Sequence, residues 1–471
     1  MQFNTLHFAI FFIIVYLIYV VLRQKWQNLL LLLAGYVFYS FWDWRFLSVI
    51  IISTILNYYL GIKIEASTDE KKRKFFMVWA VCLNLAILGF FKYSGFFVAN
   101  FQALLGFVGI HTSRASLNIV LPLGISFYTF IVMTYTIDIN RGAMKPTRNF
   151  LDFALFVSFF PTLVAGPIER ARNLLPQIQN KRAITREQFY EGCWLIFWGL
   201  YKKIVVADNL AKITRPVFEE AGHYAGREVL LAAYAFAFQI YADFSGYSDM
   251  ARGLARLMGF ELMANFNAPF FARNVYDLWQ RWHISLTTWI KEYVFYPLAL
   301  AKFRGRQLPA PLVIILTWSL MGFWHGASWK FVLWGLYHGA LVVIYSRLKP
   351  YLSGITINNP FLKRVVTAAQ IFLIFNLFCL GILFFACGSV SQVLYSFKQI
   401  FFYGSGTLGL DLSMIAMIPF LVLEYRQFRS DDELVLFKWP LLKRVFMCYI
   451  ILYCILLFGD FGVQKYYYFQ F

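Results

Sequence analysis

Three of the chain's six histidines, His283, His325 and His338, lie in sequence that is otherwise apolar. They belong to two stretches rich in Trp and Gly, WQRWHISLTTW at 279–289 and GFWHGASWKFVLWGLYHG at 322–339. A protonatable side chain is costly to keep inside an apolar helix bundle, so an intramembrane histidine predicts a functional site. A neutral, desolvated imidazole offers the chemistry of a general base.

The sequence around His325 predicts a break between two helices. Gly322 and Gly326 flank it, and Ser328 is placed to cap the helix that follows. The apolar run 310–324 gives only about 22 Å of helix, which is shorter than a bilayer core. We therefore expect His325 within the membrane, facing a cavity and close to a helix N-terminus that can stabilise an oxyanion. The alternative is a buried histidine that bonds a backbone carbonyl.

His283 follows a segment with helix-start signals. Asn274 is a candidate N-cap three residues before Asp277, and Asp277 and Arg281 are spaced to pair on one helix. If that helix continues, His283 shares a face with Trp279. Two readings stay open for His283: a direct catalytic role, or a polar residue that orients a helix.

The other ionisable residues carry weaker signals. His338 lies inside the helix after the break, where we expect a packing or supporting role, and His7, His111 and His223 lie near predicted helix ends or loops. No pair of histidines has metal-site spacing, and the six cysteines show no CxxC pattern, so we expect neither a metal nor disulfides. The sequence also contains no GxSxG elbow and no P-loop. The polar stretch 241–260, which includes Asp249, predicts either the solvated face of an interfacial helix or a polar wall of a cytoplasmic entrance.

Composition fixes the class of protein that must position these residues. Hydrophobic residues make up 60% of the chain and charged residues only 14%, which predicts an integral membrane protein. The net charge of +19 lies in short loops between apolar runs, a pattern typical of membrane topology and not of nucleic-acid binding. The first run, 5–22, has no preceding basic residue and is followed by Arg23 and Lys25, so we expect a retained span with the N-terminus outside.

Long apolar runs predict roughly 11 to 13 membrane helices in an all-α polytopic fold. The stretch 153–165 is broken by Pro161 and predicts a re-entrant segment. We expect amphipathic, mostly non-spanning helices over 246–283 and a partly inserted segment over 285–300. The predicted spans lie near residues 5–22, 28–43, 46–63, 75–98, 117–137, 190–211, 229–245, 310–324, 329–346, 366–386, 412–424 and 445–460.

Basic loops set the predicted orientation. The runs 71–74, 363–364 and 443–444 should lie in the cytoplasm, which places the C-terminal tail outside. No internal repeat and no separate soluble domain is visible. The chain is therefore predicted to be a single membrane domain over 1–471, composed of N-terminal helices (1–116), a catalytic core (117–386), and C-terminal helices with an extracytoplasmic tail (387–471).

Several stretches resemble the membrane-bound O-acyltransferases, and within them the bacterial branch typified by the membrane subunit of alginate O-acetylation. The resemblance covers most of the chain from about residue 120 onward, in order. The matching stretches are LPLGISFYTF at 121–130, YTIDINRG at 135–142, FFPTLVAGPIERARNLLPQI at 159–178, YADFSGYSDMARGLARLMGF at 241–260, LWQRWHISLTTWIKEYVFYPL at 278–298, GFWHGASWKFVLWGLYHG at 322–339 and the final FQF.

This resemblance implies a ring of helices around short non-spanning ones, with an outer funnel and a cytoplasmic opening that meet at His325. The family's second histidine falls on His283. Members move an acyl group from a cytoplasmic donor, usually acyl-CoA, to a hydroxyl. In this branch a separate extracytoplasmic transferase completes the modification. The tail resembles a motif whose tyrosine has been proposed as an acyl carrier, which falls on Tyr468, although Tyr466 and Tyr467 precede it and an aromatic membrane anchor is the alternative.

The resemblance also sets our expectations for ligands. Acetyl-CoA is the expected donor, with no bound cofactor, and its phosphates are expected near Arg170, Arg172, Arg273 and Lys291. D-alanyl transfer from a carrier protein and transport without covalent chemistry are the alternatives. Expected partners are membrane lipid, the acyl donor (acetyl-CoA or acyl carrier protein) and an esterase-like extracytoplasmic acetyltransferase at a bacterial inner membrane, with no nucleic acid. The further residues expected at the substrate site are Trp282, Trp324, Ser328, Asp249 and Asn274.

Overall fold

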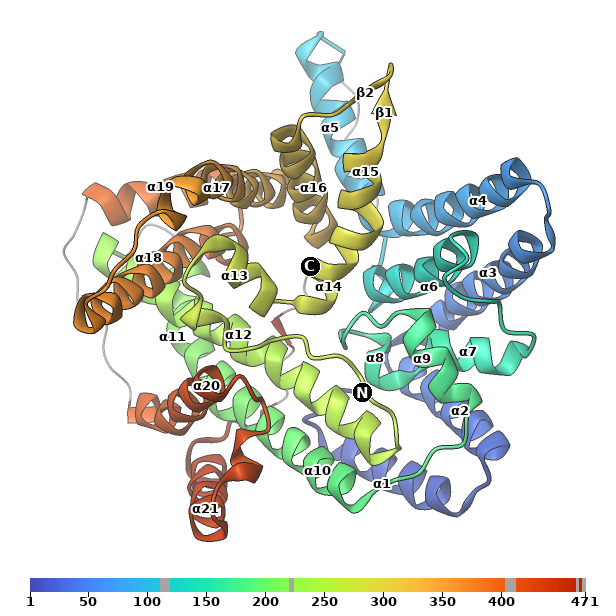
Figure 1. Cartoon of the computed structure of the whole chain (residues 1–471), viewed down its shortest axis with the longest axis horizontal. Helices are drawn as coiled ribbons and strands as arrows, with labels where there is room; N and C mark the ends of the chain where they lie inside the picture. The colour runs from blue at the N-terminus through green and yellow to red at the C-terminus, as the bar shows by residue number, and fades with distance from the viewer. Residues whose placement is uncertain (111–118, 220–223, 403–411, 463–465, 468–471) are drawn as a thin grey trace. The chain divides into compact units, whose positions relative to one another are not determined.

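The computed structural model is almost entirely helical, as the apolar periodicity predicts. Within the described residues, the only strands are β1 (Lys302–Phe303) and β2 (Arg306–Gln307), which form a short antiparallel hairpin. The chain folds into two compact units, one made of Met1–Ile196 with Ser248–Met263 and the other of Phe197–Tyr247 with Ala264–Phe471. The structure describes the whole chain except residues 111–118, 220–223, 403–411, 463–465 and 468–471 (Figure 1).

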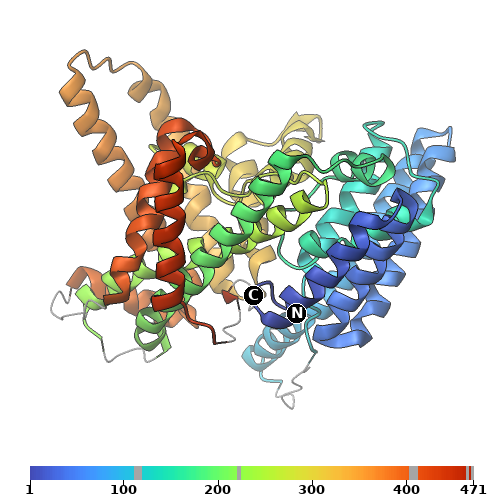
Figure 2. The same ribbon diagram turned by 90° about the horizontal axis from the view of Figure 1, so that it is seen from below.

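Packed helices make up the first unit. Within it, α3 packs against α4 and α6, and α2 packs against α7; these helices run side by side in Figure 2. α10 begins here and continues into the second unit. The helices are α1 (Leu6–Val21), α2 (Gln24–Asp43), α3 (Leu47–Ala66), α4 (Glu70–Leu88), α5 (Ser94–Phe107), α6 (Ile125–Asn140), α7 (Phe150–Ser158), α8 (Phe160–Leu163), α9 (Ala171–Gln179) and α10 (Arg186–Tyr201).

The helix break predicted within 153–165 is present. α7 ends at Ser158, Phe159 is extended, and the four-residue α8 starts at Phe160 with Pro161 in its first turn. Gly166 is required where the chain turns back, because a Cβ at that position would overlap the carbonyl oxygen of Pro161. All of these side chains are buried, so the irregular backbone is enclosed by protein.

The second unit holds the histidines. Its α16 and α17 form a tightly packed hairpin, and α17 also packs against α13 and α18 (Figure 1). Two π-helical turns interrupt it, η3 (Lys202–Ala207) and η5 (Lys291–Phe295). Its helices are α11 (Asp208–Glu219), α12 (Gly226–Leu257, shared with the first unit), α13 (Val275–Arg281), α14 (Ile284–Ile290), α15 (Tyr296–Leu300), α16 (Ala310–His325), α17 (Trp329–Ser353), α18 (Pro360–Ala386), α19 (Val390–Phe402), α20 (Ile418–Ser430) and α21 (Leu441–Phe458).

One predicted helix boundary is wrong. The expected end of a span at residue 245 does not occur, because α12 is a continuous helix of 32 residues. Gly246 lets it pass close to α10: a Cβ there would lie 2.7 Å from the carbonyl oxygen of Gly199. Close packing thus keeps a glycine inside a helix that its propensity would weaken.

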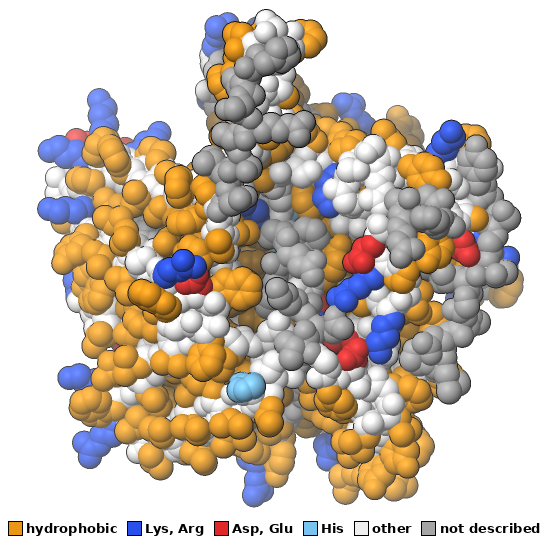
Figure 3. Space-filling model, turned by 180° about the vertical axis from the view of Figure 1, so that it is seen from behind, with side chains coloured by type: hydrophobic (Ala, Val, Ile, Leu, Met, Phe, Trp, Pro, Cys, Tyr) orange, Lys and Arg blue, Asp and Glu red, His pale blue; other side chains and the backbone are white. Residues whose placement is uncertain are grey.

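Apolar helices long enough to cross a bilayer confirm the membrane class. Among the described residues there are six such segments, and apolar side chains cover most of the face shown in Figure 3. The predicted run 310–324 corresponds to α16, which is apolar but only 16 residues long. The six segments are Gln24–Ala66, Glu70–Phe107, Gly226–Leu257, Trp329–Ser353, Pro360–Ala386 and Leu441–Phe458.

Candidate active site

His325 is the last residue of α16, at the predicted break. Gly322 and Gly326 are both needed there, because a Cβ at Gly322 would overlap the carbonyl oxygen of Phe331 and one at Gly326 would overlap the Phe331 ring. Ser328 occupies the N-cap position of α17, but its side chain makes no capping hydrogen bond within the described structure. The close approach of two backbones therefore fixes the turn that carries His325.

Aromatic rings enclose the His325 side chain, which is 7% exposed. Its ring centroid lies 4.9 Å from Trp324, 5.1 Å from Trp334 and 5.2 Å from Phe385, each in an edge-on arrangement. The side chain that would act as the base is therefore held in a mostly aromatic surrounding. That His325 also faces a cavity stays a prediction.

His283 does not lie on a helix, so its predicted shared face with Trp279 is wrong. α13 ends at Arg281, Trp282 is extended, and His283 has a left-handed backbone with φ of 44° before α14 starts at Ile284. A non-glycine residue in this conformation costs about 1 kcal/mol or more, and such strain is often retained at functional sites.

Asn265 organises the break at His283. Its Oδ1 lies 3.0 Å from His283 Nδ1 and accepts from the backbone N–H and the hydroxyl of Ser285, at 3.2 and 2.9 Å. Its backbone carbonyl accepts from the N–H of Ile284 at 2.9 Å. Because Oδ1 can only accept, His283 carries its proton on Nδ1 and its lone pair on Nε2. Burial lowers the pKa of His283 to about 3, so the imidazole is neutral at physiological pH.

The Trp324 ring lies close to both histidines. Its ring centroid is 6.4 Å from that of His283 and 4.9 Å from that of His325. The structure therefore brings His283, Trp324 and His325 together, although their segments are about forty residues apart. Trp282 points instead into an aromatic cluster, 4.7 Å from Phe378.

His338 is almost fully buried among tryptophans. Its ring lies 4.9 Å from Trp279 and 4.9 Å from Trp334, and neither of its nitrogens has a hydrogen-bond partner in the described part of the chain. Trp334 touches His325 on the other side, at 5.1 Å. His338 is thus one ring removed from His325.

The predicted start of α13 is confirmed. Asn274 Oδ1 accepts from the N–H of Asp277 at 2.9 Å, and Asp277 pairs with Arg281 at 2.7 Å. The second carboxylate oxygen of Asp277 accepts from the N–H of Arg273, whose guanidinium lies 5.6 Å from the Phe428 ring centroid. These contacts give Asn274 a capping function and leave its expected substrate contact a prediction.

A cavity of about 360 Å³ lies beside this helix start. Trp279 Nε1 and Thr317 Oγ1 line it and have no hydrogen-bond partner among the residues that the structure describes. Mostly apolar walls with a few polar groups are typical of ligand sites. The lining residues are Tyr276, Trp279, Gln280, Thr287, Ile290, Lys291, Phe295, Ile314, Thr317, Trp318, Met321 and Val342.

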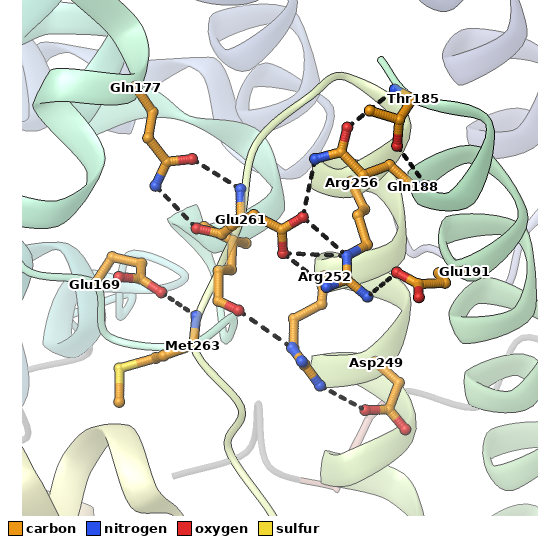
Figure 4. A network of polar contacts seen from close by, with 11 residues as sticks. Glu169, Gln177, Thr185, Gln188, Glu191, Asp249, Arg252, Arg256, Glu261 and Met263 are labelled. Atoms are coloured by element: carbon orange, nitrogen blue, oxygen red, sulfur yellow. Dashed lines mark hydrogen bonds and ion pairs between the residues drawn. The ribbon is translucent and has the colours of Figure 1, made fainter. Parts of the chain in front are cut away.

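Asp249 belongs to the first unit, where it lies at one end of a polar network and contacts Arg252 (Figure 4). It lies 3.9 Å from Arg252, and the nearby Glu169 accepts from the N–H of Met263 at 2.5 Å. Burial raises the pKa of the Glu169 carboxyl to about 7. The network is a structural element of that unit, and Asp249 as a substrate ligand stays a prediction.

Two arginines expected near the donor phosphates also lie in the first unit. Arg170 is 3% exposed and donates to the carbonyl oxygen of Ile168 at 2.6 Å. Arg172 pairs with the buried Asp138 at 3.2 Å. Both therefore have protein partners that a phosphate would have to replace.

Tyr468 lies outside the described residues, but the two tyrosines before it are described. The N–H of Tyr467 donates to Asp243 at 2.8 Å, and its hydroxyl donates to the carbonyl oxygen of Phe385 at 3.1 Å. Sequence reasoning missed Asn265 and the anchoring function of Asp243. A carboxylate within the apolar part of α12 was the available signal for Asp243, whereas no local pattern marks Asn265.

Comparisons with known proteins agree on one family. The profile of the membrane-bound O-acyltransferase family matches residues 143–390. The chain is 40% identical to the probable alginate O-acetylase of Azotobacter vinelandii, over 74% of this chain and 69% of that protein. It is 34% identical to the peptidoglycan O-acetyltransferase of Helicobacter pylori, over 73% and 70%. It is 31% identical to the teichoic acid D-alanyltransferase of Bacillus subtilis, over 49% and 60%.

Proposed function

We propose a specific reaction for this chain, which belongs to the membrane-bound O-acyltransferase family and is a multi-pass membrane acyltransferase. An acetyl group passes from cytoplasmic acetyl-CoA through the membrane and ends on an extracytoplasmic polysaccharide. Alginate and peptidoglycan are the candidate acceptors, because relatives are named for them. A separate esterase-like transferase completes the modification. The chain would lie in a bacterial cytoplasmic membrane with both ends outside.

The observation that carries this proposal is that two buried histidines, His283 and His325, both lie close to the Trp324 ring. His325 accepts the proton of the attacking hydroxyl while the hydroxyl oxygen bonds to the thioester carbonyl carbon. The C–S bond then breaks, and the CoA thiolate takes that proton from the imidazolium. The positive end of the α17 helix dipole stabilises the oxyanion, and the neutral His283 orients or polarises the reacting group.

The donor arm fits the cavity beside α13. Pantetheine is an extended chain with amide carbonyls, which the unpartnered Trp279 and Thr317 donors could bind. Lys291 lines the same cavity, which supports its role near the phosphates, with Arg273 as a second cation. No bound cofactor is needed, because acetyl-CoA is a substrate.

Tyr468 is the proposed acyl carrier toward the partner enzyme. The support comes from its neighbour: Tyr467 bonds to Phe385, and the Phe385 ring lies 5.2 Å from His325. An aromatic anchor at the membrane surface is the competing role for Tyr468. Acyl loading of the tail, detected by mass spectrometry after incubation with acetyl-CoA, distinguishes the two.

The decisive test is His325→Ala in cells and in purified protein. Surface O-acetylation and acetyl-CoA turnover should both fall at least 1000-fold, because the general base is lost. His7→Ala, which changes an exposed histidine in α1, is the matched control and should retain activity. Acetylation retained in a folded His325→Ala protein would refute the assignment.

D-alanyl transfer from a carrier protein is the second candidate, since a named D-alanyltransferase is among the relatives. The same purified protein can be offered acetyl-CoA and D-alanyl carrier protein separately. His325-dependent release of CoA supports the first donor, and His325-dependent discharge of the carrier supports the second.

A further inference from the structure

Three charged side chains are buried together in the second unit. Lys203, Asp208 and Asp243 are 1%, 4% and 2% exposed. The Lys203 ammonium lies 2.9 Å from Asp208 Oδ1 and 2.8 Å from Asp243 Oδ1. Burying one cation and two carboxylates has a large desolvation cost, so a cluster of this kind is poorly explained by stability alone.

Two members of this ion cluster, Asp243 and Lys203, contact the C-terminal tail. Asp243 uses its second oxygen, Oδ2, to accept the N–H of Tyr467 at 2.8 Å. The Lys203 ammonium lies 4.4 Å from the ring centroid of Tyr466, a cation–π distance. Tyr466 is 1% exposed and packs edge-on against Tyr247 at 5.1 Å. Tyr466 therefore forms part of the core of the unit.

The chain is guided to this point by the turn η3 and helix α11. After α21 ends, the carbonyl oxygen of Phe458 accepts from Asn209 at 2.7 Å, and the N–H of Asp460 donates to the carbonyl oxygen of Ile204 at 2.9 Å. Asp460 also pairs with Lys212 at 3.2 Å. The widened π-helical turn carries both Lys203 and the Ile204 carbonyl, in line with the frequent use of π-bulges at functional sites.

Beyond the ion cluster, the tail reaches the wall of the histidine site. The Tyr467 hydroxyl bonds to the backbone of Phe385, and the ring of Phe385 contacts His325. A shift of Tyr467 would therefore change the distance between His325 and the residues that follow Tyr467 in the sequence.

We propose that the ion cluster is a positioning device for the acyl-carrying tail, with Asp243 as the positioning residue. Lys203 holds Asp243 through one oxygen, and the other oxygen fixes the backbone of Tyr467. The effect of this anchoring on catalysis rests on the proposed function, in which a tail hydroxyl receives the acetyl group near His325. The anchoring itself does not depend on that assumption.

Asp243→Asn tests the anchor at constant volume. One polar atom of the amide becomes a donor, so it cannot serve both the Lys203 ammonium and the Tyr467 N–H as acceptor. We expect tail peptides that include residues 466–467 to exchange amide hydrogen at least tenfold faster in the purified full chain. Asp208→Asn is the matched variant: Asp208 bonds to Lys203 through Oδ1 and, within the described residues, makes no hydrogen bond to Tyr466 or Tyr467, so tail exchange should stay at the wild-type rate.

Tyr467→Pro provides a second route that leaves the cluster intact. It deletes the N–H that Asp243 accepts, and with the side chain it also removes the hydroxyl bond to Phe385 and the ring contact with Phe236. Tyr467→Phe, which keeps the N–H and loses only the hydroxyl, is therefore measured beside it. Both Asp243→Asn and Tyr467→Pro should lower kcat for acetyl transfer at least tenfold with KM for acetyl-CoA unchanged, because the donor site is untouched. A merely structural role would lower the amount of folded protein and not separate kcat from KM.

Three outcomes would overturn the proposal. The first is amide exchange of the tail at the wild-type rate in both Asp243→Asn and Tyr467→Pro. The second is a loss of tail protection in Asp208→Asn as large as that in Asp243→Asn. The third is faster tail exchange in a variant whose acetyl transfer is as fast as in wild type. If wild-type protein transfers no acetyl group at all, the proposed function fails, while the exchange experiment still decides the anchor.

Discussion

Asn265 shows how one side chain can set the chemistry of another. Its Oδ1 accepts from the N–H and hydroxyl of Ser285 and contacts His283 Nδ1, so it fixes both the strained backbone and the tautomer of the histidine. The lone pair of the neutral ring then lies on Nε2. In metal sites and catalytic triads, too, a hydrogen bond to one ring nitrogen of a histidine determines the protonation of the other nitrogen.

Removing that amide should therefore affect function more than a comparable surface change. In Asn265→Ala, several buried donors lose their acceptor, at a cost of about 1–3 kcal/mol each, and the His283 ring loses its orientation. We expect a lower melting temperature and at least a tenfold loss of acetyl transfer. Asn267→Ala removes only an exposed bond to Asp431 and is the control. Equal effects of the two changes would contradict the special role of Asn265.

The buried state of His283 also predicts a pH dependence of stability. Its folded pKa of about 3 lies below the ordinary value of 6.5, so the unfolded chain binds a proton that the folded chain does not. The stability contribution is present above pH 6.5 and is lost as pH falls from 6.5 toward 3. Wild-type protein should lose melting temperature between pH 7 and pH 5 more steeply than His283→Gln. Parallel curves would show that His283 is not the titrating group.

Glu169 should change the pH dependence of stability in the opposite direction from His283. Its folded pKa of about 7 exceeds the ordinary 4.5, so the folded chain binds the extra proton, and its contribution is present below pH 4.5 and lost as pH rises toward 7. Glu169→Gln should therefore be more stable than wild type at pH 8, by comparison of melting temperatures. The difference should shrink at pH 5, and a constant difference would exclude ionisation as its cause.

At the scale of elements, the break between α16 and α17 depends on glycine packing. Gly322→Ala would push the α16 backbone away from Phe331 and should destabilise the protein by about 1–3 kcal/mol, as overpacking does. Gly95→Ala in α5 is the control, because nothing lies within 4 Å of its added Cβ. Its melting temperature should stay level or rise, whereas that of Gly322→Ala should fall together with acetyl transfer.

Features set by residues close together in the sequence were predicted correctly, whereas features set by residues far apart were missed. Local signals located the break at His325, the Asn274 cap and the interruption near Pro161. The break at His283 was missed because Asn265, eighteen residues earlier, supplies the bonds that replace the helix. The length of α12 was missed because it depends on a contact between Gly246 and α10. The spacing of apolar residues cannot encode either contact. It also gave no prediction of the helix α19.

At the scale of the whole molecule, the proposed reaction requires the donor and the acceptor on opposite sides of the membrane. The basic run 71–74 marks one side, and α21, an apolar helix of 18 residues with Lys443 and Arg444 in its first turn, is a candidate span that leads to the other. The tail that follows α21 would then reach His325 from outside while acetyl-CoA reaches it from the cytoplasm.

This topology can be measured with single cysteines in a background without native ones. Thr68→Cys, beside the basic run, should react with a membrane-impermeant thiol reagent only after the cells are permeabilised. Phe461→Cys, at a position that is 69% exposed, should react in intact cells. Both changes leave every Lys and Arg in place, so the charges that determine the orientation are preserved. If both positions were labelled from the same side, the tail would lie on the cytoplasmic side, across the membrane from the acceptor. That result would exclude the tail as the outward acyl carrier.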